Sequence, residues 1–234
     1  MENNDVNMVK PLPRAASMRE QVYGVLRDAL AGGDLKPGTP IALDELAGRL
    51  GVSRTPVREA LLRLETEGFV TIRPRSGISV RILTREDIRN LYQMIGALEA
   101  SVLVTESHLL TGEKTAAMRT QNDACRAALE QDDFDAYYTA NLAMHGGYLE
   151  LSANRELVHH VTVMKQRLYD FPRKGSFVKE WELTSVDEHE EIISHLEAGD
   201  FAWAAEVVRD VHWSYAVQEK WIEMYYREEM EAGA

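Results

Sequence analysis

Apolar residues recur at helical spacing in the N-terminal part of the chain. Ser17 and Glu20 form a capping box for a predicted helix over 18–31, whose apolar stripe stops at a pair of glycines. A short helix is predicted over 44–50, with a glycine as its stop signal. A longer helix is predicted over 53–67, in which the first residue, a serine, is the expected N-cap.

After residue 68 the period of the pattern changes from helical spacing to alternation. Segments 69–73 and 78–82 alternate and flank the turn residues 74–77, which predicts a small β-hairpin. Three helices followed by a hairpin are typical of a winged helix-turn-helix domain.

From residue 85 onward the apolar spacing is helical and no strand is predicted. About six helices are expected, near 85–108, 112–131, 133–151, 154–172, 180–198 and 201–230. The fold class is therefore mainly α. We predict a disordered arm at 1–16, the winged domain at 17–83, and an all-α effector-binding and dimerisation bundle at 84–234.

Charge is divided unevenly between these two parts, although the whole chain has a net charge of −12. Residues 1–83 carry 12 Lys and Arg and 10 Asp and Glu, whereas the remaining residues carry 14 and 28. A basic N-terminal part suits a nucleic-acid partner. The chain shows one cysteine, no signal peptide and no apolar run long enough for a membrane, which predicts a cytoplasmic protein.

The predicted helix over 53–67 carries basic residues outside its apolar stripe. Arg54 and Arg58 are one turn apart, so both guanidinium groups leave the same side of the helix near its start. Free amides at a helix N-terminus attract phosphate, and arginine pairs bidentately with guanine. The pattern favours a DNA-reading helix, although solvated arginines on a plain helical hairpin give the same spacing.

Residues 22–80 resemble the winged-helix domain of the GntR family, most specifically in GVSRTPVREALLRLETEGFV (51–70). The resemblance implies six DNA-contacting residues on the recognition helix and the wing tip: Arg54, Thr55, Pro56, Arg58, Ser76 and Gly77. The chain departs from the family at Asp44, where some members carry a base-reading arginine. That contact is not carried over.

The segments NLAMHGGYLELSANREL (141–157) and EHEEIISHLEAGD (188–200) are similar to the FCD ligand-binding domain of the FadR-type branch. Metal-binding members use an Asp or Asn four residues before a His, and then a His on each of two later helices. The resemblance implies four metal ligands: Asn141, His145, His189 and His212. Three imidazoles and one oxygen suit Zn²⁺, with Ni²⁺ as an alternative.

Two further departures concern this second domain. The stretch from Asp200 to His212 is one residue longer than the family pattern, which turns His212 away from the site unless the chain absorbs the extra residue. Ile95 replaces an arginine that clamps organic acids in other members. Three basic residues remain as substitutes, each expected at the surface: Arg119, Lys165 and Arg167.

The predicted function is a ligand-responsive transcriptional regulator, such as a repressor. A homodimer would bind a palindromic DNA operator, and a small organic or sugar acid would act through the helical domain. An acyl-CoA-binding regulator without metal and a metalloenzyme are the alternatives. No nucleophile motif, phosphate loop or dinucleotide fingerprint occurs, so no catalytic residue is predicted.

Overall fold

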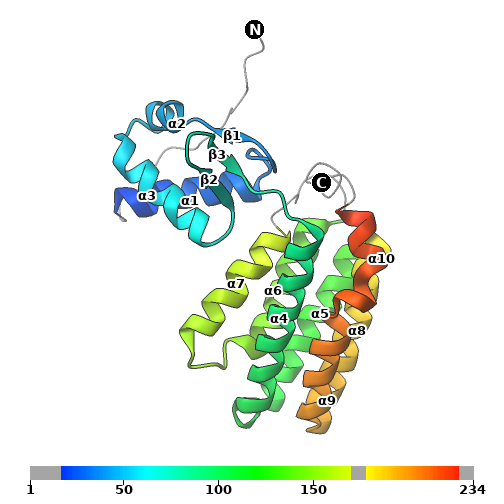
Figure 1. The fold of residues 1–234 in the computed structure, drawn as a ribbon. Helices are drawn as coiled ribbons and strands as arrows, with labels where there is room; N and C mark the ends of the chain where they lie inside the picture. The colour runs from blue at the N-terminus through cyan, green and yellow to red at the C-terminus, as the bar shows by residue number, and fades with distance from the viewer. Residues whose placement is uncertain (1–16, 170–177, 227–234) are drawn as a thin grey trace. The chain divides into compact units, whose positions relative to one another are not determined.

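The computed structural model describes residues 17–169 and 178–226, and these form a mainly helical protein, as predicted (Figure 1). Two compact units divide the chain: of the described residues, 17–84 and 166–169 belong to the first, and 85–165 and 178–226 belong to the second. The predicted arm over 1–16 lies outside the described residues. None of the described helices combines the length and apolar character that a membrane crossing requires.

The first unit is a winged helix-turn-helix domain. Its elements are α1 (Met18–Ala31), β1 (Pro40–Ile41), α2 (Leu43–Leu50), α3 (Arg54–Thr66), β2 (Val70–Arg73) and β3 (Gly77–Val80). The three strands form an antiparallel sheet in the order β1-β3-β2, in which Ile78 lies opposite both Ile41 and Ile72. Strand β1 was not predicted, because two residues are too few to show a period.

The helices of this unit pack through the apolar stripes that the sequence predicted. On α1 the buried residues include Val22, Leu26 and Leu30, and α3 buries Val57 and Leu61. The Ser17 hydroxyl accepts a hydrogen bond from the Glu20 amide at 3.3 Å, which confirms the first cap. The prediction for Ser53 was wrong in one respect: it occupies the N-cap position of α3, but its side chain makes no capping hydrogen bond.

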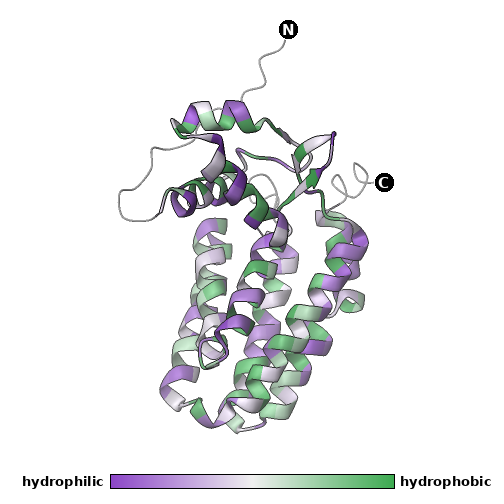
Figure 2. Cartoon of the chain, turned by 60° about the vertical axis from the view of Figure 1, so that its left-hand side comes forward, coloured by the Kyte–Doolittle hydropathy of each residue, from purple (hydrophilic) through white to green (hydrophobic). Residues whose placement is uncertain are grey.

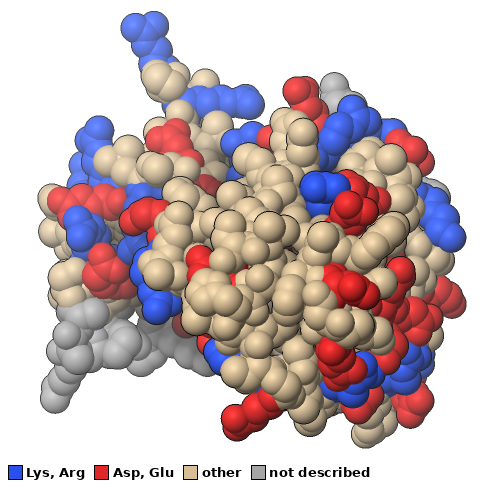
Figure 3. Space-filling view, turned by 90° about the horizontal axis from the view of Figure 1, so that it is seen from below, with Lys and Arg blue, Asp and Glu red and all other residues tan. Residues whose placement is uncertain are grey.

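The second unit is a helical bundle whose helices carry both hydrophobic and hydrophilic residues (Figure 2). Its elements are α4 (Arg85–Thr105), the 3₁₀ turn η1 (Ser107–Leu109), α5 (Gly112–Glu130), α6 (Phe134–Leu149), α7 (Arg155–Tyr169), α8 (Lys179–Ala198), α9 (Phe201–Glu206), η2 (Val207–His212) and α10 (Tyr215–Tyr225). Acidic side chains are numerous along one side of the face shown in Figure 3, in keeping with the acidic composition of residues 84–234.

The single long helix predicted over 201–230 is broken within the described residues. The α-helical α9 passes into η2, which is π-helical, and α10 then begins at Tyr215. The Trp213 amide donates to the Val208 carbonyl at 2.9 Å, five residues back, which is the π-helical pattern. Apolar spacing alone did not reveal this change, because a shift of the backbone hydrogen bonds by one residue depends on packing that the sequence pattern does not show.

Candidate metal centre and nucleic-acid interface

Helix α6 carries the first two predicted metal ligands. Asn141 and His145 are both almost fully buried, and their spacing of four residues places them on the same face of the helix. The Asp133 side chain caps α6 by accepting a hydrogen bond from the Ala136 amide at 3.0 Å. This cap fixes where the helix begins, and packing of its buried face then turns the two polar residues toward the bundle interior.

His189 lies on α8 and is fully buried. Its Nδ1 is 3.1 Å from Oδ1 of Asn122, on α5, while Nδ2 of Asn122 donates to the Val186 carbonyl at 3.1 Å. Because the amide nitrogen of Asn122 is already donating, its oxygen accepts from His189, which places the histidine proton on Nδ1. The lone pair of His189 is then on Nε2.

His212 ends the π-helical segment η2. A π turn holds about one residue more than an α turn, so η2 provides room for the extra residue that the family resemblance predicts between Asp200 and His212. Helix α4 accommodates η2 closely at Gly96, where an added Cβ would lie 2.9 Å from Cβ of Trp213. The side chain of His212 is therefore buried in the bundle, and its Nδ1 lies 2.7 Å from Oε2 of Glu188.

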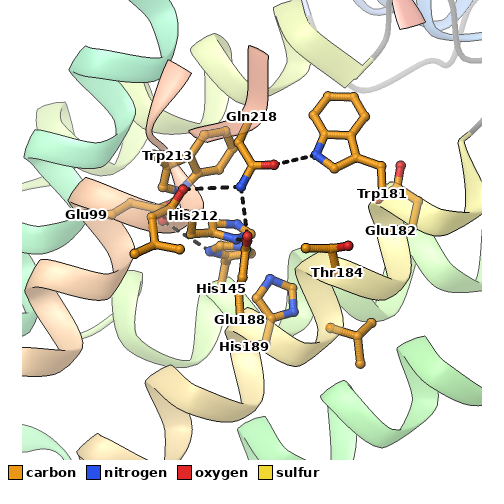
Figure 4. A network of polar contacts seen from close by, with 12 residues as sticks. Glu99, His145, Trp181, Glu182, Thr184, Glu188, His189, His212, Trp213 and Gln218 are labelled. Atoms are coloured by element: carbon orange, nitrogen blue, oxygen red, sulfur yellow. Dashed lines mark hydrogen bonds and ion pairs between the residues drawn. The ribbon is translucent and has the colours of Figure 1, made fainter. Parts of the chain in front are cut away.

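The three predicted histidines converge in the core of the second unit (Figure 4). Each offers a ring nitrogen, and these atoms lie within 4.8 Å of one another. The ring centroids are 4.8 to 5.1 Å apart, although the histidines come from α6, α8 and η2. The structure thus brings together residues that are separated by up to 67 positions in the sequence.

Each of the three imidazoles is held at Nδ1 by a polar partner. For His145 the partner is the Tyr148 hydroxyl at 2.7 Å, which itself donates to Oε2 of Glu99 at 2.5 Å. The Glu99 carboxylate also lies 3.1 Å from Nδ1 of His145 and accepts from Nε1 of Trp213 at 2.9 Å. Partners of this kind fix the tautomer and orientation of metal-binding histidines in proteins.

Lys165 is buried beside this network, and the sequence-based expectation of a surface position was wrong. Its Nζ lies 2.5 Å from Oε1 of Glu99 and 5.4 Å from the ring centroid of Trp213. Arg119, in contrast, pairs with Glu190 and Glu197 in partly exposed ion pairs. Of these two substitutes for the missing arginine, only Lys165 places a positive charge beside the histidines.

Burial determines the protonation of the site. It lowers the pKa of His145 to about 3, with the charge of Lys165 acting in the same direction. Burial also lowers the pKa of His189 well below its usual value. For Glu99, burial acts to raise the pKa, but the charge of Lys165 and the contact with His145 outweigh it and hold the pKa well below the ordinary value. Neutral imidazoles and an ionised carboxylate result at pH 7.

Buried polar atoms that lack a hydrogen-bond partner among the described residues indicate whether a metal ion would fit in this core. His145 Nε2, His189 Nε2 and Asn141 Oδ1 are buried and have no hydrogen-bond partner within the part of the chain that the structure describes. Unsatisfied buried polar atoms are costly, and a cation is a partner that uses all three. Neutral imidazole and oxygen donors fit a divalent ion. The buried cluster is thus consistent with the metal site of FCD domains.

Sequence reasoning missed the residues that hold the histidines in place: Glu99, Asn122, Tyr148, Glu188 and Gln218. Gln218 donates from Nε2 to Oε1 of Glu188 at 2.8 Å and accepts from Nε1 of Trp181 at 2.9 Å, which links α8 to α10 (Figure 4). One signal was available. Glu99 occupies a position at helical spacing from the buried residues Leu91 and Ile95, and a charge within an apolar stripe marks a buried polar partner.

In the first unit, the predicted DNA-contacting residues lie on the surface. Arg54, Thr55 and Arg58 are exposed at the start of α3, and Pro56 between them is half-buried. Arg54 pairs with Asp44 of α2. Arg58 makes no hydrogen bond or ion pair with any residue in the described ranges. The stripe that includes Val57 anchors α3, so its basic side points outward.

The wing tip is the tight turn between β2 and β3. Ser76 and Gly77 are exposed there, and the Ser76 amide donates to the Arg73 carbonyl at 3.1 Å. Gly77 has a φ of 99°, which L-residues with side chains rarely adopt. Arg73, at the end of β2, and Arg75, within the turn, are both exposed and precede Ser76, so the turn presents basic side chains next to the predicted contacts.

Two family models match this chain, one in each unit. The model described as "Bacterial regulatory proteins, gntR family" covers residues 18–80, and the model described as "FCD domain" covers residues 90–212. The chain belongs to the GntR family. It is a FadR-like GntR transcriptional regulator with a C-terminal FCD domain, which confirms the resemblance inferred from the sequence.

Relatives of this GntR-family chain are described as transcriptional regulators, in agreement with the prediction that it is no enzyme. An HTH-type regulator of Agrobacterium vitis, from the TAR-I ttuE-ttuC' intergenic region, is 36% identical over 53% of this chain and 74% of the relative. The HTH-type transcriptional repressor RspR of Escherichia coli is 28% identical over 55% of this chain and 56% of its own length.

Among solved structures, E. coli McbR/YncC has a similar fold, with a TM-score of 0.66 over 92% of this chain and 99% of that chain. A GntR regulator from Rhodococcus sp. RHA1 gives a TM-score of 0.65 over 93% and 99%. The sequence identities are 20% and 21%, so these likenesses support the fold alone.

Proposed function

We propose that this GntR-family chain is a metal-loaded, ligand-responsive regulator that binds a palindromic operator as a homodimer. The winged domain, residues 17–83, would place the start of α3 in the major groove and the wing tip beside the adjacent backbone. The six predicted contacts are Arg54, Thr55, Pro56, Arg58, Ser76 and Gly77. Because the operator lies on the chromosome, the protein would act in the cytoplasm.

The proposal that the protein responds to a ligand is supported by the buried cluster of three histidines. We propose that the ion is Zn²⁺, or Ni²⁺ as the alternative, held by His145, His189, His212 and Asn141. The ion would satisfy the buried nitrogen and oxygen atoms that lack a partner among the described residues, and it would offer open positions to an acidic ligand. The cluster favours this function over an acyl-CoA-binding regulator without metal.

The buried charges support an organic or sugar acid as the effector. Asn141 is neutral where an aspartate would cancel one charge of the ion, so the ion keeps an excess of positive charge, because the charge of Lys165 is already balanced by Glu99. A carboxylate would offset this excess and would be recognised without the arginine that Ile95 replaces. The acid would alter operator affinity only to the extent that it binds the DNA-bound and free arrangements of the dimer unequally.

The test combines metal analysis with DNA binding. Untagged full-length protein is analysed for bound metal and titrated onto DNA fragments from its own promoter region, with and without zinc and a panel of organic and sugar acids. We expect a stoichiometric ion, binding at low salt, and one acid that raises the melting temperature and changes DNA affinity. If the protein binds none of the DNA fragments, the proposal that it is a transcriptional regulator is contradicted. If it binds DNA but contains no metal, only the proposal of a metal centre is contradicted.

A further inference from the structure

The first unit contains an ion pair that the family pattern does not imply. Asp44 lies in the first turn of α2, and Arg54 is the first residue of α3. Both oxygens of Asp44 engage the guanidinium group, one at Nε and one at Nη2. The two side chains are 67% and 70% exposed, so the pair stands in solvent beside the predicted DNA-reading residues.

Stability does not account for this pair. Exposed ion pairs contribute little to folding, because water screens the attraction and two long side chains lose freedom. The two helices are already held in place by buried residues, which are Leu46 and Ala47 on α2 and Val57 on α3. The consequence of the pair is therefore the orientation of Arg54.

The pairing leaves one edge of Arg54 available. An arginine carries five N–H donors, of which Asp44 takes the one on Nε and one on Nη2. The remaining edge, formed by Nη1 and the second hydrogen of Nη2, has no acceptor among the described residues. Two parallel N–H donors at such an edge match O6 and N7 of guanine in the major groove.

We propose that Asp44 is a positioning residue for base recognition, which holds Arg54 so that its free edge reads a guanine in each half-site. This inference rests on the proposed function, since it takes α3 as the DNA-reading helix. An arginine that is already oriented loses less side-chain freedom when it pairs with a base. The carboxylate also cancels the charge of Arg54, so that residue adds specificity and little general attraction for phosphate.

Arg58 provides the contrast within the same helix. It lies one turn further along α3 and has no ion-pair partner among the described residues, so its full charge is free to attract the DNA backbone. The neighbouring carboxylate Glu45 also differs from Asp44, because it pairs with Arg49 of its own helix at 2.7 Å. Glu45→Gln thus removes the same charge from the same turn without releasing Arg54, and it is the matched control.

The experiment selects preferred duplexes from a random DNA library with the zinc-loaded full chain, and then measures binding to every single-base-pair variant. Arg54→Lys keeps the charge, removes the planar fork and identifies the base pair that Arg54 reads. At that base pair we expect Asp44→Asn to reduce the preference for guanine about tenfold. Glu45→Gln keeps the wild-type preference, and Asp44→Asn changes nothing further in the Arg54→Lys background.

The salt dependence of DNA affinity is a second measurement, and it would not change if Asp44 had only a structural role. Freeing Arg54 adds one phosphate-seeking charge, so Asp44→Asn steepens the dependence of log affinity on log salt by about one per half-site. Thermal unfolding of each variant confirms that it is folded. If Asp44→Asn binds all sequences more tightly with an unchanged base preference, the inference is overturned. If the wild-type chain selects no sequence, the proposed DNA-binding function falls together with it.

Discussion

The winged unit of this regulator carries its chemistry on its surface, whereas the FCD unit carries its chemistry inside its own hydrophobic core. In the winged unit the polar groups that would meet DNA, such as Arg54 and Arg58, stand on the surface of a helix held by an apolar stripe. In the FCD unit His145, His189 and His212 lie inside the bundle and replace apolar packing there. The difference teaches that function and folding are separable in the first unit and coupled in the second.

The coupling in the FCD unit has an electrostatic cause. Burial keeps His145 and His189 neutral, with pKa values below their usual range, and the unfolded chain would bind protons that the folded chain does not. Stability from these groups is therefore present above a pH of about 6.5 and declines as the pH falls toward the lower native values. The exposed arginines of the winged unit impose no such condition on folding.

The largest expected effect comes from removing one buried histidine. His189→Ala removes a proposed ligand and the partner of Asn122, so we expect zinc affinity to fall by at least about 100-fold and stability to change as well. His195→Ala, on the same helix but partly exposed, should keep the wild-type metal content. Elemental analysis and thermal unfolding measure both. Retention of the metal by His189→Ala, shown to be folded by circular dichroism, contradicts the coupling.

The next effect tests the residues behind the histidines. Asn122→Ala leaves all four proposed ligands in place but removes the oxygen that faces Nδ1 of His189. We expect a loss of zinc affinity of about 10–100-fold, because such partners fix the ligand tautomer. Competition with a chelating dye gives the affinity. The exposed neighbour Asp123 supplies the control as Asp123→Ala. Equal affinities for the two variants would show that orientation by Asn122 is unimportant.

The winged unit should respond in the opposite way. Arg54→Ala is expected to weaken operator binding by about 1–3 kcal/mol while leaving the melting temperature unchanged, because the side chain is exposed. Fluorescence anisotropy with a selected duplex measures the binding. Arg126→Ala removes an exposed, ion-paired arginine of the FCD unit and should change neither quantity. A large drop in melting temperature for Arg54→Ala would show that this side chain contributes to folding as well as to DNA binding.

The last effect, which appears only when two pH values are compared, concerns Glu182, a second buried acid in the FCD unit. Burial raises its pKa to about 7, so the native state holds a proton that the unfolded state releases from a pH of about 4.5 upward. Its stabilising contribution is lost as the pH rises through about 7. Glu182→Gln keeps an acceptor for the Tyr137 hydroxyl and removes this dependence.

Relative to wild type, Glu182→Gln should therefore gain about 1–3 kcal/mol more in unfolding free energy at pH 8 than at pH 5. Urea unfolding at the two pH values, with chelator present, gives the difference. The exposed Glu180→Gln, two residues away on α8, is expected to show no such difference. A gain that does not depend on pH would show that Glu182 is ionised throughout this range.

The fold class of each unit and most of its helices could be predicted from the amino-acid sequence. Apolar spacing predicted α1 and α3, and the change to alternation predicted the β2–β3 hairpin, because both periods are local properties of the backbone. The resemblance supplied the three histidines, which the fold then brought together. The prediction that Lys165 lies at the surface was wrong, because the sequence around a helical lysine does not reveal that it pairs with the buried Glu99.

The contacts that hold the two sites in place form between helices and could not be predicted from the sequence. The π-helical η2 provides room for the extra residue that the family resemblance predicts before His212, and a change of hydrogen-bond register leaves no trace in composition. The partners Asn122 and Glu188, and the pairing of Asp44 with Arg54, arise from helices that meet in space. The physical reason is the same in each case. The orientation of a side chain depends on its neighbour on another helix, and a sequence pattern shows only which residues are near one another along the chain.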